Sequence, residues 1–226
     1  MLLFDLINLV YPRACLSCGD LLHKSENFLC LLCLTSLPKT NFHLEEDNHV
    51  TRKFSGKTKI ENASAYYFYT KDSLVQNLIH KIKYKGFINA SYEIGKNYGR
   101  ELLTKENYRS VDIIIPVPLH KKKQRKRGYN QSEYFARGLG YSMDKEVNNN
   151  ILFRVLETET QTKKKIYERW LNVRSIFMIK NSYIIEGKHI LLVDDVITSG
   201  STICSCAEAL LTVPGVTVSV VGIATV

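Results

Sequence analysis

The chain has 226 residues, enough for one ordinary domain and a small additional module. Its hydrophobic fraction of 45% and charged fraction of 23% exclude a chain too polar to form a core. The net charge of +9 suits a polyanionic partner or phosphorylated substrates and does not distinguish between them.

Residues 1–12 are apolar, but they lack a basic region, contain Asp5 and are too few to span a bilayer. Arg13 stands where a lipoprotein cleavage site before Cys15 needs a small residue. We therefore predict a cytoplasmic protein without membrane insertion. Its N-terminal segment is expected to pack on the protein's own core through four apolar side chains, Leu3, Phe4, Ile7 and Val10.

Two Cys-x-x-Cys pairs, Cys15/Cys18 and Cys30/Cys33, are separated by eleven residues. Four thiolates in two tight turns favour tetrahedral Zn²⁺, and four cysteine ligands leave no open position, so the zinc is expected to be structural. Gly19 suits the positive φ that such a turn needs. Two disulfides or a redox Cys-x-x-Cys are the alternatives, disfavoured by a reducing compartment and by the lack of a strand–helix context.

Residues 34–61 contain Pro38, a short acidic run and no periodicity, which indicates a connection. The chain is therefore divided into a zinc-binding module with its connection, residues 1–61, and a main domain, residues 62–226. Gly56-Lys57-Thr58 resembles the end of a P-loop, but Thr51 replaces the first glycine and no strand precedes it.

Residues 63–69 are predicted to form a strand, and Asp72 is expected to cap an amphipathic helix. Three lysines at the end of that helix suit its dipole, and a second helix is predicted over residues 88–103. The apolar face of the first helix and its terminal lysines are Leu74, Val75, Leu78, Ile79 and Ile82, then Lys81, Lys83 and Lys85.

Residues 111–115 predict a buried strand that ends at Pro116. A basic loop without acids follows, and Asn130 then begins another helix. Arg127 and Gly128, at a helix start after a sheet strand, indicate an oxyanion site, because arginine binds oxygens in a fork and glycine lets N–H groups approach. A solvated basic loop is the alternative. The loop contains Lys121, Lys122, Lys123, Arg125 and Lys126.

Residues 190–202 predict a buried strand, two acids (Asp194 and Asp195) where it ends, a turn of small hydroxyl residues around Gly200, and a helix. Free N–H groups, hydroxyls and a positive helix end make an anion site. The alternative is a solvent-facing turn with acids that serve only as caps. The turn consists of Thr198, Ser199, Gly200, Ser201 and Thr202, and a last apolar strand is predicted over residues 216–226.

Residues 190–202 resemble the phosphoribosyl-pyrophosphate (PRPP) motif of type I phosphoribosyltransferases. Together with the four cysteines, Pro-Val-Pro-Leu from Pro116 and Arg-Gly-Tyr-Asn-Gln from Arg127, they resemble the ComF-type competence proteins over almost the full length. The resemblance implies an α/β domain with a mainly parallel sheet, which the strand–helix alternation also favours. Ser199 is a mild departure, because threonine is commoner there in the family.

The resemblance further implies that Asp194 and Asp195 hold the ribose hydroxyls, directly or through Mg²⁺. Residues 198–202 would hold the 5′-phosphate, and Arg127 and Gly128 the pyrophosphate. The polar, basic residues 157–174 match a mobile loop of such enzymes or form a plain solvated helix. Three residues there match the family pattern, Gln161, Arg169 and Asn172.

Two functions follow from these expectations. The first is a phosphoribosyltransferase-like protein that binds PRPP with Mg²⁺ and acts in DNA uptake and natural transformation, although no residue is identified as a base toward an acceptor. The second is a non-catalytic single-stranded-DNA-binding module beside a competence helicase, with the basic loop on phosphates and aromatic side chains on bases. The aromatic candidates are Tyr129, Tyr134 and Trp170.

Overall fold

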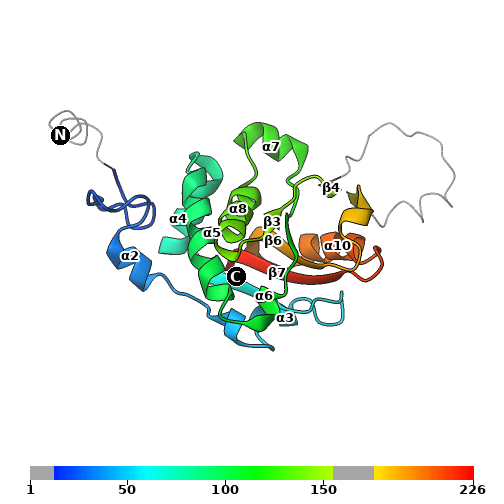
Figure 1. Cartoon of the computed structure of the whole chain (residues 1–226). Helices are drawn as coiled ribbons and strands as arrows, with labels where there is room; N and C mark the ends of the chain where they lie inside the picture. Colours follow the sequence, from blue (N-terminus) through cyan, green and yellow to red (C-terminus); the bar gives the residue numbers. More distant parts are fainter. Residues whose placement is uncertain (1–12, 155–175) are drawn as a thin grey trace.

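The computed structural model describes residues 13–154 and 176–226 (Figure 1). Its centre is a five-stranded sheet in the order β1-β7-β6-β2-β3, and every neighbouring pair is parallel. The predicted α/β class with a mainly parallel sheet is therefore confirmed. The strands are β1 (Ala63–Phe68), β2 (Ile113–Pro116), β3 (Glu146–Val147), β6 (His189–Ile197) and β7 (Thr217–Thr225). An antiparallel pair, β4 (Leu152–Arg154) and β5 (Phe177–Ile179), lies outside it.

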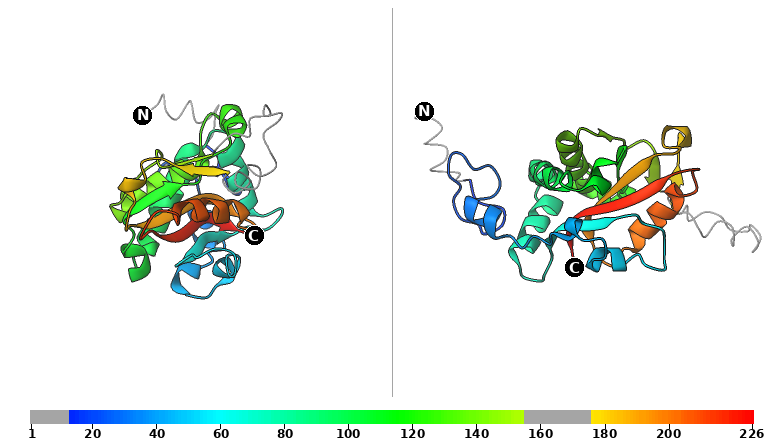
Figure 2. Two further views of the ribbon diagram at one scale, coloured as in Figure 1. Left: turned by 90° about the vertical axis from the view of Figure 1, so that its right-hand side faces the viewer. Right: turned by 60° about the horizontal axis from the view of Figure 1, so that its bottom comes forward.

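Apolar side chains from the two faces of the sheet enter two separate cores, because successive residues of a strand point to opposite faces. Ile114 of β2 enters the core under three helices, α4 (Leu74–Tyr84), α5 (Ile88–Leu102) and α8 (Gln131–Met143). Ile113 and Ile115 enter the core under α3 (His49–Arg52) and α10 (Ser201–Leu210). Figure 2 shows the helices on both sides of the sheet.

Helices α5 and α8 cross at very short range through glycines. A Cβ on Gly95 would collide with the Phe135 carbonyl, and a Cβ on Gly138 with the Tyr92 carbonyl. This contact holds α8 against the sheet, and the start of α8 carries site residues described below. The described part also contains four short helical segments: α2 (Leu31–Ser36), α6 (Glu106–Arg109), η1 (Phe42–Leu44) and η2 (Ser182–Ile184).

Three sequence expectations were wrong in local detail. Ser73, not Asp72, caps α4: its side chain accepts the Gln76 N–H at 3.1 Å. The predicted basic loop is a helix, α7 (Lys121–Arg127), because lysine, arginine and glutamine favour helix and neither glycine nor proline interrupts them. Gly128, with φ 81°, ends it.

The third difference concerns the acids, which were expected after the strand but lie within β6. Strand β7 runs on beside them, with Asp194 opposite Gly222 and Ile197 opposite Thr225, so the ladder continues. Within residues 34–61, Phe54 is buried in the core beneath α10. Within the described residues, no helix is both long enough and apolar enough to cross a membrane.

Candidate functional site

The acids lie at the point in the sheet where the order of successive strands reverses, between β2 and β6. From β2 the chain passes through α8 on one face to β3 at the sheet edge, whereas from β6 it passes through α10 on the other face to β7. Parallel sheets bind ligands at the carboxyl ends of strands at such a switch point. Strand β2 ends with Pro116 opposite Val193, so the next residues of β6, Asp194 and Asp195, have no strand on that side.

The two carboxylates are partly buried and have different partners. Asp194 accepts hydrogen bonds from the Ser132 hydroxyl at 3.1 Å and from the Asp195 N–H at 2.8 Å. Asp195 forms an ion pair with Lys83 at the end of α4, with 3.0 Å between Oδ2 and Nζ. Burial, followed by the repulsion of Asp195, raises the pKa of Asp194 to about 7. An added cation would favour the ionised form of Asp194.

The turn that follows β6 leaves a small polar hollow of about 60 Å³, whose lining includes Asp194, Thr198 and residues 200–203. Gly200 has φ 77° and is the N-cap of α10, so it offers no side chain to the first N–H groups of the helix. Ser199 Oγ reaches the Ser201 N–H only at 3.5 Å. Unsatisfied N–H groups at a positive helix end can bind an anion such as phosphate.

Arg127 and Gly128 lie at the junction of α7 and α8, beside the acid-bearing end of the sheet. The Arg127 guanidinium donates to Gln131 Oε1 at 2.9 Å and stacks on the Tyr84 ring at 5.0 Å from its centroid. Gln131 is followed by Ser132, the partner of Asp194. Arg127 therefore belongs to the same cluster as the acids. Its guanidinium is placed where it could pair with an anionic group at the other end of a ligand.

Lys83 and Ser132 are site residues that sequence reasoning missed. The sequence assigns Lys81 and Lys85 to the helix dipole and gives Lys83 no other role, because its contact with Asp195 joins residues far apart in the chain. A usable signal was its position one helical turn after the buried Ile79, on the side of α4 that faces the sheet. Ser132 lies two residues after the N-cap Asn130, whose side chain accepts its N–H at 3.2 Å.

The four module cysteines form a cluster suited to a metal ion. All four sulfurs lie within 4.8 Å of one another, and Cys18 and Cys30 are 3.7 Å apart. Two sulfurs at about 2.3 Å from a tetrahedral zinc lie about 3.8 Å apart. Burial opposes ionisation of Cys15, but N–H donors, Cys30 first, outweigh it and lower its pKa to about 6. These thiols fit zinc, and none is in a disulfide.

The module is attached to α4 by polar contacts. The Ser17 hydroxyl donates to the Leu74 carbonyl at 3.0 Å, and the Lys81 ammonium donates to the Cys15 carbonyl at 3.3 Å. Gly19 has φ 90°, as its place after the first cysteine pair predicts. The cysteine cluster therefore supports the helix whose end carries Lys83.

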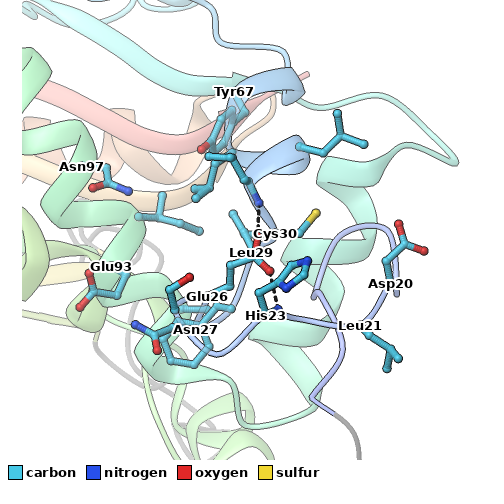
Figure 3. A pocket seen from close by; sticks show the side chains of 17 residues that line it. Asp20, Leu21, His23, Glu26, Asn27, Leu29, Cys30, Tyr67, Glu93 and Asn97 are labelled. Atoms are coloured by element: carbon cyan, nitrogen blue, oxygen red, sulfur yellow. Dashed lines mark hydrogen bonds between the residues drawn. The ribbon is translucent and has the colours of Figure 1, made fainter.

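A larger hollow, of about 820 Å³, lies between the module and α5 (Figure 3). Its lining combines leucines with the acids Asp20, Glu26 and Glu93, which repel phosphate. N–H donors at His23 and Leu31 hold the Glu26 carboxylate, lower its pKa and keep it ionised. The hollow contains none of the predicted phosphate-binding residues.

Some predicted candidates are placed apart from this cluster or cannot be placed. Gln161, Arg169 and Asn172 lie outside the described residues, as do Trp170 and residues 1–12. Lys121, Lys122, Lys123 and Arg125 belong to α7, and Arg125 is exposed. Tyr129 is engaged within the fold, since its hydroxyl donates to the Ile82 carbonyl at 2.6 Å. Cys204 and Cys206 are buried among apolar side chains.

A family model described as "Phosphoribosyl transferase domain" matches residues 149–226. The chain is 29% identical over 204 residues to Competence protein ComFC of Bacillus subtilis, an alignment covering 88% of this chain and 78% of that protein. It is 37% identical over 102 residues to Competence protein F of Haemophilus influenzae, covering 44% of each. With DNA utilization protein YhgH of Salmonella typhi the identity is 27% over 146 residues, covering 63% of each.

Among solved structures, the chain is similar to the glutamine phosphoribosylpyrophosphate (PRPP) amidotransferase from B. subtilis complexed with ADP and GMP. The identity is 20% and the TM-score 0.43, over 63% of this chain and 30% of that one.

Proposed function

We propose that this chain, a ComF-type protein of the phosphoribosyltransferase family, binds PRPP or another ribose phosphate with Mg²⁺ at the carboxyl ends of β2 and β6. The family resemblance drawn from the sequence is confirmed by the matching domain model and by relatives named for competence and DNA utilization. The ligand, the metal ion and the residue roles are our proposal.

One observation carries the proposal: two acids, an anion-binding helix start and an arginine meet at one switch point. In this arrangement the turn 198–202 takes the 5′-phosphate, Asp194 and Asp195 take the ribose hydroxyls, and Arg127 with Gly128 takes the pyrophosphate. Each assignment matches charge to charge or donor to acceptor. A ligand with phosphate at both ends and hydroxyls between them uses every part.

Magnesium fits the acids chemically. Carboxylate oxygens are ligands that Mg²⁺ prefers, and a cation would offset the burial and the repulsion from Asp195 that raise the pKa of Asp194. Asp194 and Asp195 would hold the ion, and it would neutralise charge on the phosphates. Ser132 already orients one of these carboxylates through its hydroxyl.

Phosphoribosyl transfer would break the bond between ribose C1 and a pyrophosphate oxygen, whose electron pair would leave with pyrophosphate, and would form a bond between C1 and the nucleophilic atom of an acceptor. The acids would lie near a sugar that becomes cation-like, and Arg127 near the leaving group as its charge develops. Catalysis of this kind consists largely of positioning and electrostatics. We propose transfer of the phosphoribosyl group as the activity.

Calorimetric titration of PRPP with and without Mg²⁺ tests the proposal. The parent is expected to bind PRPP in Mg²⁺, and an Asp194→Asn variant to bind about ten- to a hundredfold more weakly, the effect of one charge-assisted contact. An Asp144→Asn variant, at the exposed end of α8, serves as the control. Equal binding by all three proteins would refute the proposed site.

A second function is favoured by α7, whose seven residues include six basic ones and no acid. Such a helix suits a nucleic-acid backbone, and relatives named for competence and DNA utilization support single-stranded DNA as its ligand. We propose that the chain acts in DNA uptake in the cytoplasm, beside a competence helicase. Single-stranded DNA added as a competitor in the titration tests whether the two ligands share the site.

We also propose that Zn²⁺ is bound by Cys15, Cys18, Cys30 and Cys33. Its role would be structural, because four thiolates fill a tetrahedral site. Residues 1–61 would then form a zinc-binding module with its connection, and residues 62–226 the phosphoribosyltransferase-like domain.

A further inference from the structure

Lys83 and Asp195 form an ion pair that solvent scarcely reaches. Their nitrogen and oxygen are 3.0 Å apart, and the two side chains are only 20% and 15% exposed. Removing charges from water is costly, so such a pair needs a reason to persist beyond general stability. Asp195 is also one of the two acids at the proposed ligand site. The pair therefore occupies the carboxylate that a divalent cation would use.

The backbone around Lys83 is fastened to the segment that carries Arg127. Gln131 Nε2 donates to the Lys83 carbonyl at 3.4 Å, and Tyr129 donates to the Ile82 carbonyl at 2.6 Å. The next residue, Tyr84, contacts Arg127 by ring stacking and by a 3.3 Å hydrogen bond. The main chain of Lys83 is thus fixed, and only its flexible side chain can exchange partners.

We propose that Lys83 is an exchangeable counter-ion. In the ligand-free protein it neutralises Asp195, and with ligand bound it leaves Asp195 to a divalent cation and pairs with the ligand's anionic phosphates. An ammonium and a divalent cation repel each other at one carboxylate, so they compete for it. The freed ammonium starts close to the Arg127 end of the site, because the Gln131 side chain contacts both the Lys83 carbonyl and the Arg127 guanidinium. This inference rests on the proposed function.

If Lys83 exchanges partners in this way, its replacement should change the affinities for Mn²⁺ and for PRPP in opposite directions. Lys83→Met keeps side-chain length and removes the competing charge, so Mn²⁺ alone is expected to bind about tenfold more tightly than to the parent. In saturating Mg²⁺, PRPP is expected to bind about tenfold more weakly, because one cation is lost from the phosphates. Calorimetry measures both affinities on the full chain.

Lys85→Met is the matched control, since Lys85 is exposed, lies two residues further on and carries the same charge. It is expected to leave both affinities unchanged. Lys83→Arg retains the charge and is expected to keep both affinities within about threefold of the parent. If Lys83→Met fails to fold, Lys83→Gln replaces Lys83→Met in the same titrations. The folding of Lys83→Arg then shows whether the charge at this position is needed for the fold.

If Lys83 had only a structural role, Lys83→Met would weaken the binding of both Mn²⁺ and PRPP, or would change neither. Either result overturns the proposal. An unchanged Mn²⁺ affinity also overturns the proposal, and so does a failure of both the parent and the Lys83→Met variant to bind Mn²⁺. If the parent binds no PRPP in Mg²⁺, the proposed function fails. The Mn²⁺ titration still shows in that case whether Lys83 competes for Asp195.

Discussion

The Phe54 ring lies directly against Gly200, so the segment that follows the four cysteines supports the turn of residues 198–202. A Cβ added to Gly200 would lie 2.8 Å from Phe54 Cε1, closer than such contacts allow. Phe54 is 1% exposed and belongs to the core beneath α10. The position of the turn is therefore fixed on one side by the β6 ladder and on the other by an aromatic ring.

Gly200→Ala is expected to destabilise the protein as well as weaken PRPP binding. The left-handed φ of 77° costs an alanine about 1–2 kcal/mol, and the contact with Phe54 adds to it. Denaturation with urea measures the change in the free energy of unfolding. In a Phe54→Leu background the same substitution should cost less, because the ring is absent. Strictly additive costs would show that Phe54 does not restrict this position.

Removal of zinc is expected to unfold the module and loosen α4, because Ser17 and Lys81 join the two. Metal analysis should find one zinc per chain, and Cys30→Ser should lose it and aggregate. Cys204→Ser, outside the cluster, controls for the loss of a cysteine and should retain zinc. A zinc-free protein with an unchanged melting temperature would contradict the structural role.

The sequence predicted the sheet, its main helices and the cysteine cluster because these depend on local pattern and spacing. Strand β6 begins with the apolar run of residues 190–193, strand β7 is mostly apolar, and α4 shows a clear apolar face. The pairing of Lys83 with Asp195 could not be predicted, since it joins two residues that only the tertiary fold brings together. The same holds for Phe54, whose local sequence has no periodicity and whose burial depends on α10.

The pH dependence of stability is expected to reveal Asp194. Its folded pKa of about 7 lies above the usual value of about 3.9, so the folded protein retains a proton that the unfolded chain releases. The stability from that proton is complete below pH of about 4 and is lost as the pH rises through about 7. Mg²⁺ affinity should increase over the upper part of this range.

Asp194→Asn cannot titrate, so its free energy of unfolding should fall less than that of the parent between pH 5 and pH 8. We expect a difference of at least about 1.4 kcal/mol, the equivalent of one pKa unit. His43 and His189, whose pKa values burial lowers, contribute equally to both proteins and cancel. Identical profiles would mean that Asp194 titrates normally.

Glutamine at Lys121, Lys122 and Lys123 is expected to weaken single-stranded DNA binding and to flatten its salt dependence, by up to about 0.7 for each phosphate that α7 no longer neutralises. PRPP affinity should change little, because Arg127 at the other end of α7 is untouched. Glutamine at the exposed Lys57, Lys59 and Lys71 gives a control with the same net charge. An equal weakening of both ligands in the α7 variant would contradict this separation of roles.

Asp195→Asn separates the contribution of Asp195 to stability from its contribution to binding. The sequence alone predicts an unchanged melting temperature, but the structure shows that the amide would leave the Lys83 ammonium four-fifths buried without its partner. We therefore expect a loss of about 1–3 kcal/mol, below the cost of breaking a fully buried pair.

Adding Lys83→Met to Asp195→Asn removes the unpaired buried charge and should restore most of that stability. PRPP binding in Mg²⁺ should remain at least about tenfold weaker in both proteins, because the carboxylate is absent from each. Denaturation and calorimetry on the four proteins of this cycle measure the two effects. If the double variant regained PRPP affinity together with stability, Asp195 would serve the fold and not the ligand.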